Sequence, residues 1–393
     1  MLKTYEYRLY PNKSQEIQIA KQFGCCRVIY NKALALRKET YEREQKHLTK
    51  YQLIAEITNW KKQEEYKWLK EVNAQALQQA IFDMDTAYQK FFREKTGFPK
   101  FKRKKSYRNS FRYPQGCKLD NEAGKIFLPK LGWTKCRIDR PINFELRSVT
   151  VKRVPSGKYF VCCLFEDGTE LPPKLPITEE TAVGIDLGLK DFAVLSNGTK
   201  IPRMRFTKNY EKQLAKLQKR YSRKTGEKNK EKARIKVARL HEKIANCRKD
   251  YLHKVSHKII SENQTNTICL ETLNVKGMMK NHKLAKSVAD VGMYMFKQML
   301  EYKADRVGKN ILYIGQYEPS TKLCDCGYKN NDLKLSDREW TCPECGRHYD
   351  RDIHASQNIK KFALSSHNLT CHNTRLGKSV ELTELLTLVK AKK

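Results

Sequence analysis

The chain has 393 residues, with 79 lysines and arginines against 43 aspartates and glutamates, so its formal net charge is +36 at pH 7. This length suffices for two or three hydrophobic cores. A charge excess of this size makes a compact protein repel itself, and a polyanion relieves that repulsion, so nucleic acid is the favoured partner and an anionic membrane surface the alternative. No apolar run approaches the roughly 20 residues of a membrane-spanning helix, and no secretory signal is visible, so we expect no membrane partner.

The chain contains thirteen cysteines. Four of them have the spacing of metal ligands, and the other nine, such as the pairs Cys25-Cys26 and Cys162-Cys163, lie in apolar surroundings. This pattern is typical of reduced, buried thiols and predicts a cytoplasmic protein without a disulfide framework.

The N-terminal region predicts one strand followed by helices. Residues 2–10 alternate apolar and polar side chains as a strand does, Pro11 ends the alternation, and Ser14 is the expected N-cap of the first helix. Apolar positions at helical spacing then occur in three groups: Ile17, Ala20 and Phe23; Ile29, Ala33 and Leu36 in a second segment; and Leu77, Ile81, Met84, Tyr88 and Phe91 after Asn73. They predict the core of a small helical bundle.

The composition changes at Gly97. Residues 97–114 contain seven lysines and arginines, interleaved with aromatic side chains. Such a loop is commonly just a solvated surface, but in a chain this basic we favour phosphate neutralisation with bases stacked on the rings. The candidate nucleic-acid-binding residues are Lys100, Lys102, Arg103, Lys104, Lys105, Arg108 and Arg112.

Short β-like runs broken by Gly, Pro, Asp and Asn follow from about residue 116 to residue 170. Together with the N-terminal strand they predict a small barrel. The Pro-rich stretch 171–177 is expected to be a linker to the next domain.

A new domain begins near Ala182 with an apolar strand that ends in Asp186. A second strand, 192–195, and the turn Asn197-Gly198 complete a hairpin. An aspartate before a glycine turn is more often structural than catalytic, but a carboxylate on the first strand of such a meander is also how RNase H-like folds present a metal ligand. The charged stretch 208–260 predicts two antiparallel helices.

A short buried strand, 267–270, follows and carries Glu271 at its exit. A lone glutamate at a strand end is usually not catalytic, so this position by itself is a weak signal. A helix over 291–307 and a strand over 311–314 are predicted next.

Four cysteines then form two pairs, Cys324 with Cys326 and Cys342 with Cys345, with fifteen residues between the pairs. This spacing predicts a zinc ribbon, in which four thiolates surround one Zn²⁺. Gly327 and Gly346 each follow a pair, where positive φ is expected.

Asp350 and Asp352 come directly after the ribbon and open an amphipathic helix. We interpret Asp350 as a group at the helix N-terminus. Three acids at strand and helix ends, Asp186, Glu271 and Asp352, have the chemistry that a pair of Mg²⁺ (or Mn²⁺) ions requires for phosphodiester hydrolysis.

Residues 319–364 resemble the C-terminal signature of the TnpB proteins encoded by bacterial insertion sequences, which are compact relatives of type V CRISPR effectors. The matching residues are Ser320-Thr321-Lys322, Leu333, Leu335, Ser336, Arg338, Trp340, the four cysteines, Asp350-Arg351-Asp352, Ala355 and Asn358-Ile359. The strings YRLYP, FGCCRVIYNKAL and AVGIDLGLKDFAVLSNGTKIP and the segment around Glu271 extend the likeness over nearly the whole chain.

This resemblance implies a multidomain α+β fold. The expected domains are a wedge-like β-barrel (1–12 and 97–177), a helical recognition domain (13–96), a RuvC or RNase H-like α/β nuclease (178–318 and 347–393) and the inserted zinc ribbon (319–346). It also implies an RNA-guided DNA endonuclease of a transposable element, acting on double-stranded target DNA beside a short motif that the protein reads. It is this resemblance that implies that Asp186, Glu271 and Asp352 are the catalytic residues.

The resemblance further implies a guide RNA as partner, one copy of the chain in the RNA complex, and a nucleoid-associated protein of a bacterium or archaeon. A nuclease-inactive RNA-guided repressor and an RNase H-like transposase are the alternatives. Two departures from the family pattern matter. The first cysteine pair is one residue shorter than usual, and His348, just past the second pair, is an alternative zinc ligand to its cysteines. His354, two residues after the third acid, stands where the family usually has asparagine.

Overall fold

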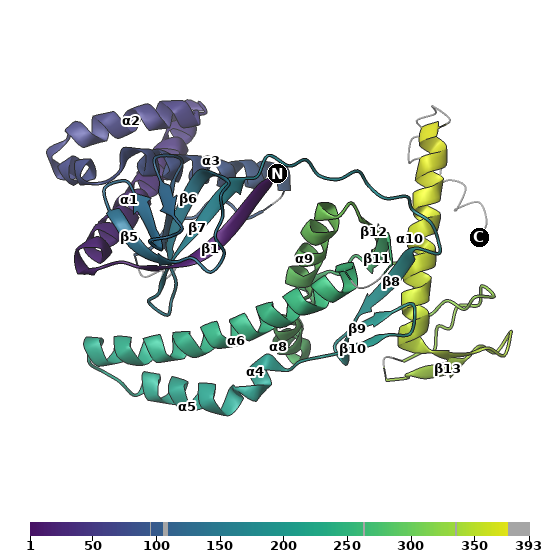
Figure 1. Cartoon of the computed structure of the whole chain (residues 1–393). Helices are drawn as coiled ribbons and strands as arrows, with labels where there is room; N and C mark the ends of the chain where they lie inside the picture. The colour runs from purple at the N-terminus through teal and green to yellow at the C-terminus, as the bar shows by residue number, and fades with distance from the viewer. Residues whose placement is uncertain (95, 105–108, 262–263, 335, 376–393) are drawn as a thin grey trace. The chain divides into compact units, whose positions relative to one another are not determined.

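The computed structural model describes residues 1–94, 96–104, 109–261, 264–334 and 336–375. The chain divides into two compact units, of which the first comprises Met1–Glu170 and Arg220–Arg239 and the second Leu171–Lys219 and Leu240–Lys393. Figure 1 shows the elements of each unit. Two of the candidate nucleic-acid-binding residues, Lys105 and Arg108, lie outside the described residues.

The first unit is built on one antiparallel sheet of seven strands. The strands are β1 (Leu2–Tyr10), β2 (Asn109–Tyr113), β3 (Lys118–Asp120), β4 (Lys125–Leu128), β5 (Gly132–Arg137), β6 (Glu145–Arg153) and β7 (Tyr159–Glu166). Their order is β2-β6-β7-β1-β5-β4-β3, so the N-terminal strand lies inside the sheet, between β7 and β5. The strands that we predicted here share one sheet, and closure of that sheet into a barrel stays a prediction.

Helices pack against this sheet and share its core. They are α1 (Lys13–Glu44), α2 (Lys50–Lys62), the 3₁₀ helix η1 (Glu64–Glu71) and α3 (Ala74–Glu94). The expectation of two segments after residue 12 was wrong, because α1 is one continuous helix that passes through Gly24. The expected cap was also wrong. Asn12 caps α1, and its side-chain oxygen accepts from the Gln15 N–H at 2.9 Å while the Gln15 side chain accepts from the Asn12 N–H at 3.0 Å.

The buried face of α1 also differs from the expected one. Ile17 is 61% exposed and Ala20 is exposed, whereas Ile19, Phe23 and Cys26 are buried. These three residues follow each other at spacings of four and three, which is one face of a helix. The face of α3 agrees better with the prediction, since Leu77, Ile81, Met84 and Tyr88 are all buried.

The second unit contains a mixed sheet of five strands. They are β8 (Ala182–Leu187), β9 (Asp191–Leu195), β10 (Lys200–Pro202), β11 (Thr267–Glu271) and β12 (Asn310–Ile314), in the order β10-β9-β8-β11-β12. Neighbours among β8, β9 and β10 are antiparallel, whereas β11 runs parallel to both β8 and β12. The carboxyl ends of β8, β11 and β12 therefore lie at the same edge of the sheet.

Helices cover both faces of this sheet (Figure 1). The helices after β10 are α4 (Phe206–Asn209), α5 (Glu211–Ser222), α6 (Glu227–Ser261), α7 (Val275–Met278), α8 (His282–Val291), α9 (Met293–Arg306) and α10 (Arg351–Arg375). Residues of α6 and α9 pack with Val183, Ile185 and Ile268 on one face. On the other face, Ile359 and Ala363 of α10 pack with Cys269 of β11.

Two predictions about the helices of this unit have different outcomes. The antiparallel pair expected over 208–260 is present as α5 and α6. The helix expected over 291–307 begins later, because Gly292 has φ 74° and separates α8 from α9. A two-stranded hairpin, β13 (Glu339–Thr341) and β14 (His348–Asp350), leads from the cysteine segment into α10.

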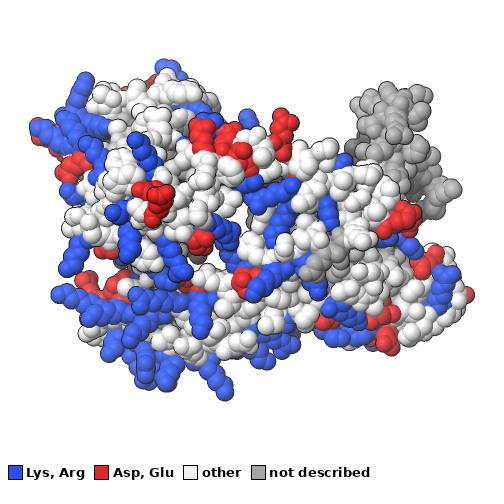
Figure 2. Space-filling view, in the orientation of Figure 1, with Lys and Arg blue, Asp and Glu red and all other residues white. Residues whose placement is uncertain are grey.

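Lysine and arginine side chains are dense over α5 and α6 in Figure 2. α5 packs against the middle of α6 through a small cluster around Leu240 and Ile244, and leaves most of its surface to charged residues. Among the described residues, no helix is long and apolar enough to cross a membrane.

Candidate active site and metal-binding residues

Helix α10 lies against strand β8 with almost no space between their backbones. A Cβ added to Gly184 would stand 1.9 Å from the carbonyl oxygen of Ser356 and 2.9 Å from the amide nitrogen of Lys360. Only glycine fits at such a contact, because a side chain at position 184 would collide with backbone atoms. The contact therefore fixes the position of α10 on the sheet.

Asp186 and Glu271 lie side by side on neighbouring strands. Ile185 of β8 is in register with Leu270 of β11, and the two acids are the next residues on these parallel strands. Side chains alternate along a strand, so Asp186 shares the face of Gly184, and Glu271 shares the face of Cys269. Both acids are thus on the face that α10 covers, at the carboxyl edge of the sheet.

Asp352 completes this group from the first turn of α10. Asp352 lies one helical turn before Ser356, and Asp186 lies two residues after Gly184, on the same face of β8. Because Gly184 and Ser356 are in contact, both acids lie beside that contact. Burial raises the pKa of Asp186 to about 7, the negative charges of Glu271 and Asp352 contribute to the rise, and Arg351 opposes it. The three predicted acids therefore converge on one site.

The residues of this site suit hard divalent cations. Burial raises the pKa of Glu271 as well. Within the described part of the chain, no protein donor binds the carboxylate of Asp186 or that of Glu271. Half-buried acids that crowd together without donors are costly when ionised, and a cation with oxygen ligands relieves that cost. Asp186, Glu271 and Asp352 would hold such ions.

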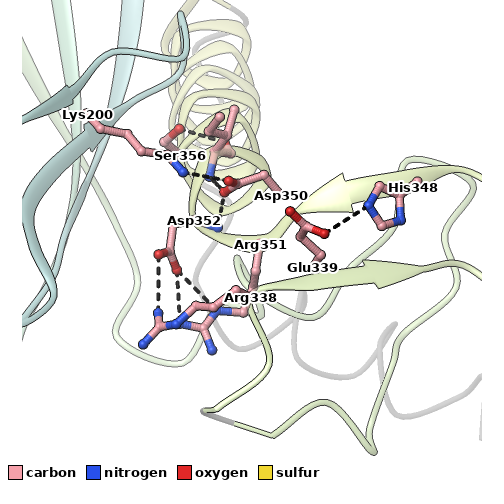
Figure 3. A network of polar contacts seen from close by, with 9 residues as sticks. Lys200, Arg338, Glu339, His348, Asp350, Arg351, Asp352 and Ser356 are labelled. Carbon is pink, nitrogen blue, oxygen red and sulfur yellow. Dashed lines mark hydrogen bonds and ion pairs between the residues drawn. The ribbon is translucent and has the colours of Figure 1, made fainter.

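The N-terminus of α10 is anchored by polar contacts (Figure 3). Asp350 accepts hydrogen bonds from the N–H groups of Asp352 and Ile353, each at 3.1 Å, and so has the position at the helix N-terminus that we predicted. Its other oxygen lies 2.6 Å from the Lys200 ammonium of β10. Burial alone would raise the pKa of Asp350, but these hydrogen bonds outweigh burial and lower it.

Two arginines hold the carboxylate of Asp352 (Figure 3). Arg351 Nη2 lies 2.9 Å from its Oδ1, and Arg338 Nη1 lies 3.3 Å from its Oδ2. Arg351 is buried, whereas the side chain of Arg338 is 43% exposed and comes from the loop before β13. Sequence reasoning gave no role to Arg338 or Lys200, because no periodicity or spacing relates them to the acids.

The four predicted zinc ligands form one cluster. Their sulfur atoms all lie within 4.8 Å of one another, with Cys324 Sγ 3.5 Å from Cys345 Sγ and Cys326 Sγ 3.6 Å from Cys342 Sγ. Four thiolates about 2.3 Å from a tetrahedral zinc ion would be about 3.8 Å apart. The cluster therefore fits one zinc ion closely.

The shorter first pair uses a shorter turn. The Gly327 N–H donates to the carbonyl of Cys324, three residues back, whereas the Gly346 N–H donates to the carbonyl of Cys342, four residues back. Both glycines have positive φ, 96° and 68°, as predicted. The Cys-x-Cys half thus loses one residue from its turn and keeps both sulfur atoms in the cluster.

The two histidines noted in the sequence lie outside these clusters. His348 is exposed, and its Nδ1 lies 3.0 Å from the Thr341 hydroxyl, so it is not placed as a substitute ligand. His354 is 1% exposed and stacks on the Tyr349 ring, with 3.8 Å between centroids. Burial lowers the pKa of His354. Among the described residues, its ring makes no hydrogen bond to Asp352.

The basic segment before β2 is only partly free for a ligand. Lys100, Arg103 and Lys104 are exposed. The Lys102 ammonium lies 4.1 Å from the centroid of the Tyr30 ring, and Arg112 pairs with Asp83 at 2.8 Å. Binding of nucleic acid by this segment remains a prediction.

Family models match three parts of the chain. Residues 1–46 match the family model HTH_OrfB_IS605, described as "Helix-turn-helix domain". Residues 163–282 match the model OrfB_IS605, described as "Probable transposase". Residues 294–359 match the model described as "Cas12f1-like, TNB domain". The third match includes the cysteine cluster and ends within α10.

Relatives match over nearly the full length. A protein of Streptomyces pristinaespiralis named "Putative RNA-guided DNA endonuclease" is 37% identical over 369 residues, which cover 93% of this chain and 90% of the relative. InsQ of Escherichia coli K12, with the same description, is 34% identical over 375 residues, covering 91% of each.

A solved structure shares the fold. The Cas12f1 chain in a complex with sgRNA and target DNA superposes with a TM-score of 0.57, covering 92% of this chain and 98% of that one, at 14% sequence identity. The two relatives, together with the family models, show that the chain belongs to the TnpB (OrfB_IS605) family of insertion-sequence proteins.

Proposed function

We propose that this protein is an RNA-guided DNA endonuclease of a transposable element, which cuts double-stranded target DNA beside a short motif that the protein reads. The observation that carries the proposal is the convergence of Asp186, Glu271 and Asp352 at one edge of the second unit's sheet. The names of its relatives and its charge of +36 support nucleic-acid partners.

Two divalent ions, Mg²⁺ or Mn²⁺, would supply an activated water and neutralise charge on the phosphate when bound. Asp186 and Glu271 present their carboxylates from rigid neighbouring strands, which keeps their separation constant. Asp350 and Lys200 fix the first turn of α10 and so orient Asp352. The strand order β10-β9-β8-β11-β12, with three antiparallel strands followed by two parallel ones, agrees with an RNase H-like nuclease domain.

The cysteine cluster would hold structural zinc through Cys324, Cys326, Cys342 and Cys345. In this proposal the sheet of the first unit is the wedge-like barrel (1–12 and 97–177), and its helices (13–96) form the recognition domain. The second unit contains the nuclease (178–318 and 347–393) and the ribbon (319–346). The exposed cations Lys100, Arg103 and Lys104 contribute to guide or target binding.

The test is a cleavage assay on protein purified with its own RNA. We expect Mg²⁺-dependent cutting of matched DNA that stops when the RNA is removed or the metal is chelated. Asp186→Ala should lower the cutting rate by more than about a hundredfold, because a lost metal ligand costs several kcal/mol in the transition state. RNA and target binding should stay as in the wild type.

Asp305→Ala is the matched control, since it removes an exposed acid of the same unit that pairs with Lys174. RNA-dependent binding by the wild type without cutting would instead indicate a repressor, and strand transfer would indicate a transposase. Equal loss of binding and cutting in Asp186→Ala would give that residue a structural role.

A further inference from the structure

A hollow of about 330 Å³ opens between α1 and η1 in the first unit. Its lining includes Lys21, Gly24, Cys25, Arg27, Trp68 and Glu71. Its size is at the lower end of the range for ligand-binding sites. It lies far along the chain from the acids and the cysteines, and nothing in the proposed chemistry uses it.

The two elements present these residues by simple helical geometry. Lys21, Gly24 and Cys25 lie at positions i, i+3 and i+4, which form one face of α1. Trp68 and Glu71 are three residues apart in a 3₁₀ helix, which has about three residues per turn, so they also share a face. The hollow is therefore a groove between two facing stripes.

Gly24 opens the floor of this groove. It lies in the interior of a 32-residue helix, where glycine is unfavourable relative to other residues. A Cβ at this position would meet only Arg27 Nη2 at 3.8 Å, so packing does not require glycine there. Glycine at position 24 thus costs helix stability without relieving a backbone clash. What its missing side chain does provide is open space in the groove.

Contacts at both ends hold the groove in shape. At one end Gln18 donates to the carbonyl of Glu71 at 2.9 Å, and Lys21 pairs with Glu71 at 2.5 Å. At the other end the Lys32 ammonium lies 3.8 Å from the centroid of the Tyr66 ring. The groove therefore exists before any ligand binds.

The chemistry of the lining combines a flat ring with a free cation. Trp68 is 37% exposed, and its indole N–H is already bound to the Glu65 carbonyl at 2.8 Å, which fixes the ring. Lys21 neutralises Glu71, whereas Arg27 has no ion pair within the described residues. A planar ligand with a negative group matches this arrangement.

We propose that the groove binds one unstacked nucleotide of a single-stranded nucleic acid, with its base on Trp68 and its phosphate at Arg27. Every base has a face that stacks on an aromatic ring, so the site accepts a nucleotide without reading its identity. This inference rests on the proposed function, because it supplies a contact for the RNA or for a displaced DNA strand.

The experiment uses the full chain and two probes, a short mixed-sequence single-stranded RNA and the DNA of the same sequence, each with thiouridine or thiothymidine for photo-crosslinking. Trp68→Ala should weaken binding of the preferred probe roughly tenfold or more, the usual effect of losing one base stack. Gly24→Leu should fill the groove and weaken binding similarly without lowering the melting temperature, because leucine favours helix more than glycine does. Tyr51→Ala, an aromatic residue of α2 that is 68% exposed, is the matched control.

Crosslinks to the peptide containing Trp68 with either probe, lost in Gly24→Leu, would support the site, and the stronger probe would identify the strand. Wild-type binding that both variants retain, with no crosslink in α1 or η1, would overturn this inference and leave the proposed function intact. A wild-type protein that binds neither probe nor its own RNA would overturn both.

Discussion

The α-carbon of Gly184 lies so close to Ser356 that a Cβ there would stand 1.9 Å from the Ser356 carbonyl oxygen. The contact joins the strand that carries Asp186 to the helix that carries Asp352. Their contact sets how far apart the two acids are.

Substitution of Gly184 by alanine should therefore change the distance between Asp186 and Asp352, although it adds only one methyl group. Both atoms that the new Cβ would meet first, Ser356 O and Lys360 N, are backbone atoms, so α10 must shift. We expect the free energy of unfolding of the second unit to fall by about 1–3 kcal/mol. Cleavage should fall further than this destabilisation explains, while RNA binding persists.

Thermal unfolding and cleavage measured on the same preparation check this prediction. Gly315→Ala is the control, because its Cβ would lie 3.5 Å from Glu318 Cγ, an ordinary contact. Wild-type cleavage by Gly184→Ala would mean that α10 is not held by this contact.

Cys342→Ser should release zinc and destabilise the segment between β12 and α10. Structural zinc contributes directly to folding, and Cys342 is a buried member of the cluster. Elemental analysis should give about one zinc per wild-type chain and much less for the variant. Cys247→Ser, at a half-buried cysteine outside the cluster, should retain the metal, as should His348→Ala. Zinc content that is equal in Cys342→Ser and the wild type would remove this residue from the ligand set.

Asp290→Ala should be strongly destabilising. The buried carboxylate of Asp290 accepts from the Thr207 N–H at 3.0 Å and from Arg248 Nη2 at 3.0 Å. Removing one partner of a buried ion pair costs about 3–5 kcal/mol, and because the Arg248 side chain is 19% exposed we expect the lower end of that range. Asp305→Ala breaks an ion pair that is half exposed on both sides and should cost less than about 1 kcal/mol. Denaturant unfolding of both variants checks the contrast, and equal midpoints would contradict it.

Asp167→Asn tests the pH dependence of the first unit. Lys3 lies 2.5 Å from the Asp167 carboxylate and Thr169 donates to it, and these contacts hold the pKa of Asp167 well below its usual range. The unfolded chain then binds more protons than the folded one in acid, so the stabilisation is present above the ordinary carboxyl pKa of about 4 and disappears as the pH falls.

The variant should accordingly melt below the wild type at pH 7, and this difference should shrink at pH 3. Melting curves at both pH values decide the matter. If the difference in melting temperature between variant and wild type were the same at both pH values, the charge of Asp167 would not be the source of its stabilising effect.

The sequence was most informative where a strand ends in a polar residue. Apolar runs before Asp186 and Glu271 predicted the strands β8 and β11, because buried parallel strands have that composition. The spacing of the four cysteines predicted their cluster, because two closely spaced cysteine pairs are typical of a zinc site. The sequence alone could not show that the three acids lie together, because this depends on the register of β8 with β11 and on the position of α10, which contacts such as that of Gly184 determine.

Errors arose where several residues competed for one role. Ser14 and Asn12 are both residue types that cap helices. Asn12 is the cap because Gln15, three residues later, accepts a hydrogen bond from the Asn12 N–H. The face of α1 was misassigned because its buried side includes Gln22 and two cysteines, which an apolar count overlooks. Arg338 belongs to the family signature, but the signature does not say that it contacts Asp352, since that contact depends on how the loop before β13 folds back.

The third acid reaches the sheet from the last helix of the described chain. During translation, β8 and β11 can pair while α10 is still inside the ribosome, so a nascent polypeptide has two of its carboxylates in place and lacks the third. In the proposed nuclease, the metal site would therefore stay incomplete until α10 has left the ribosome and packed on the sheet.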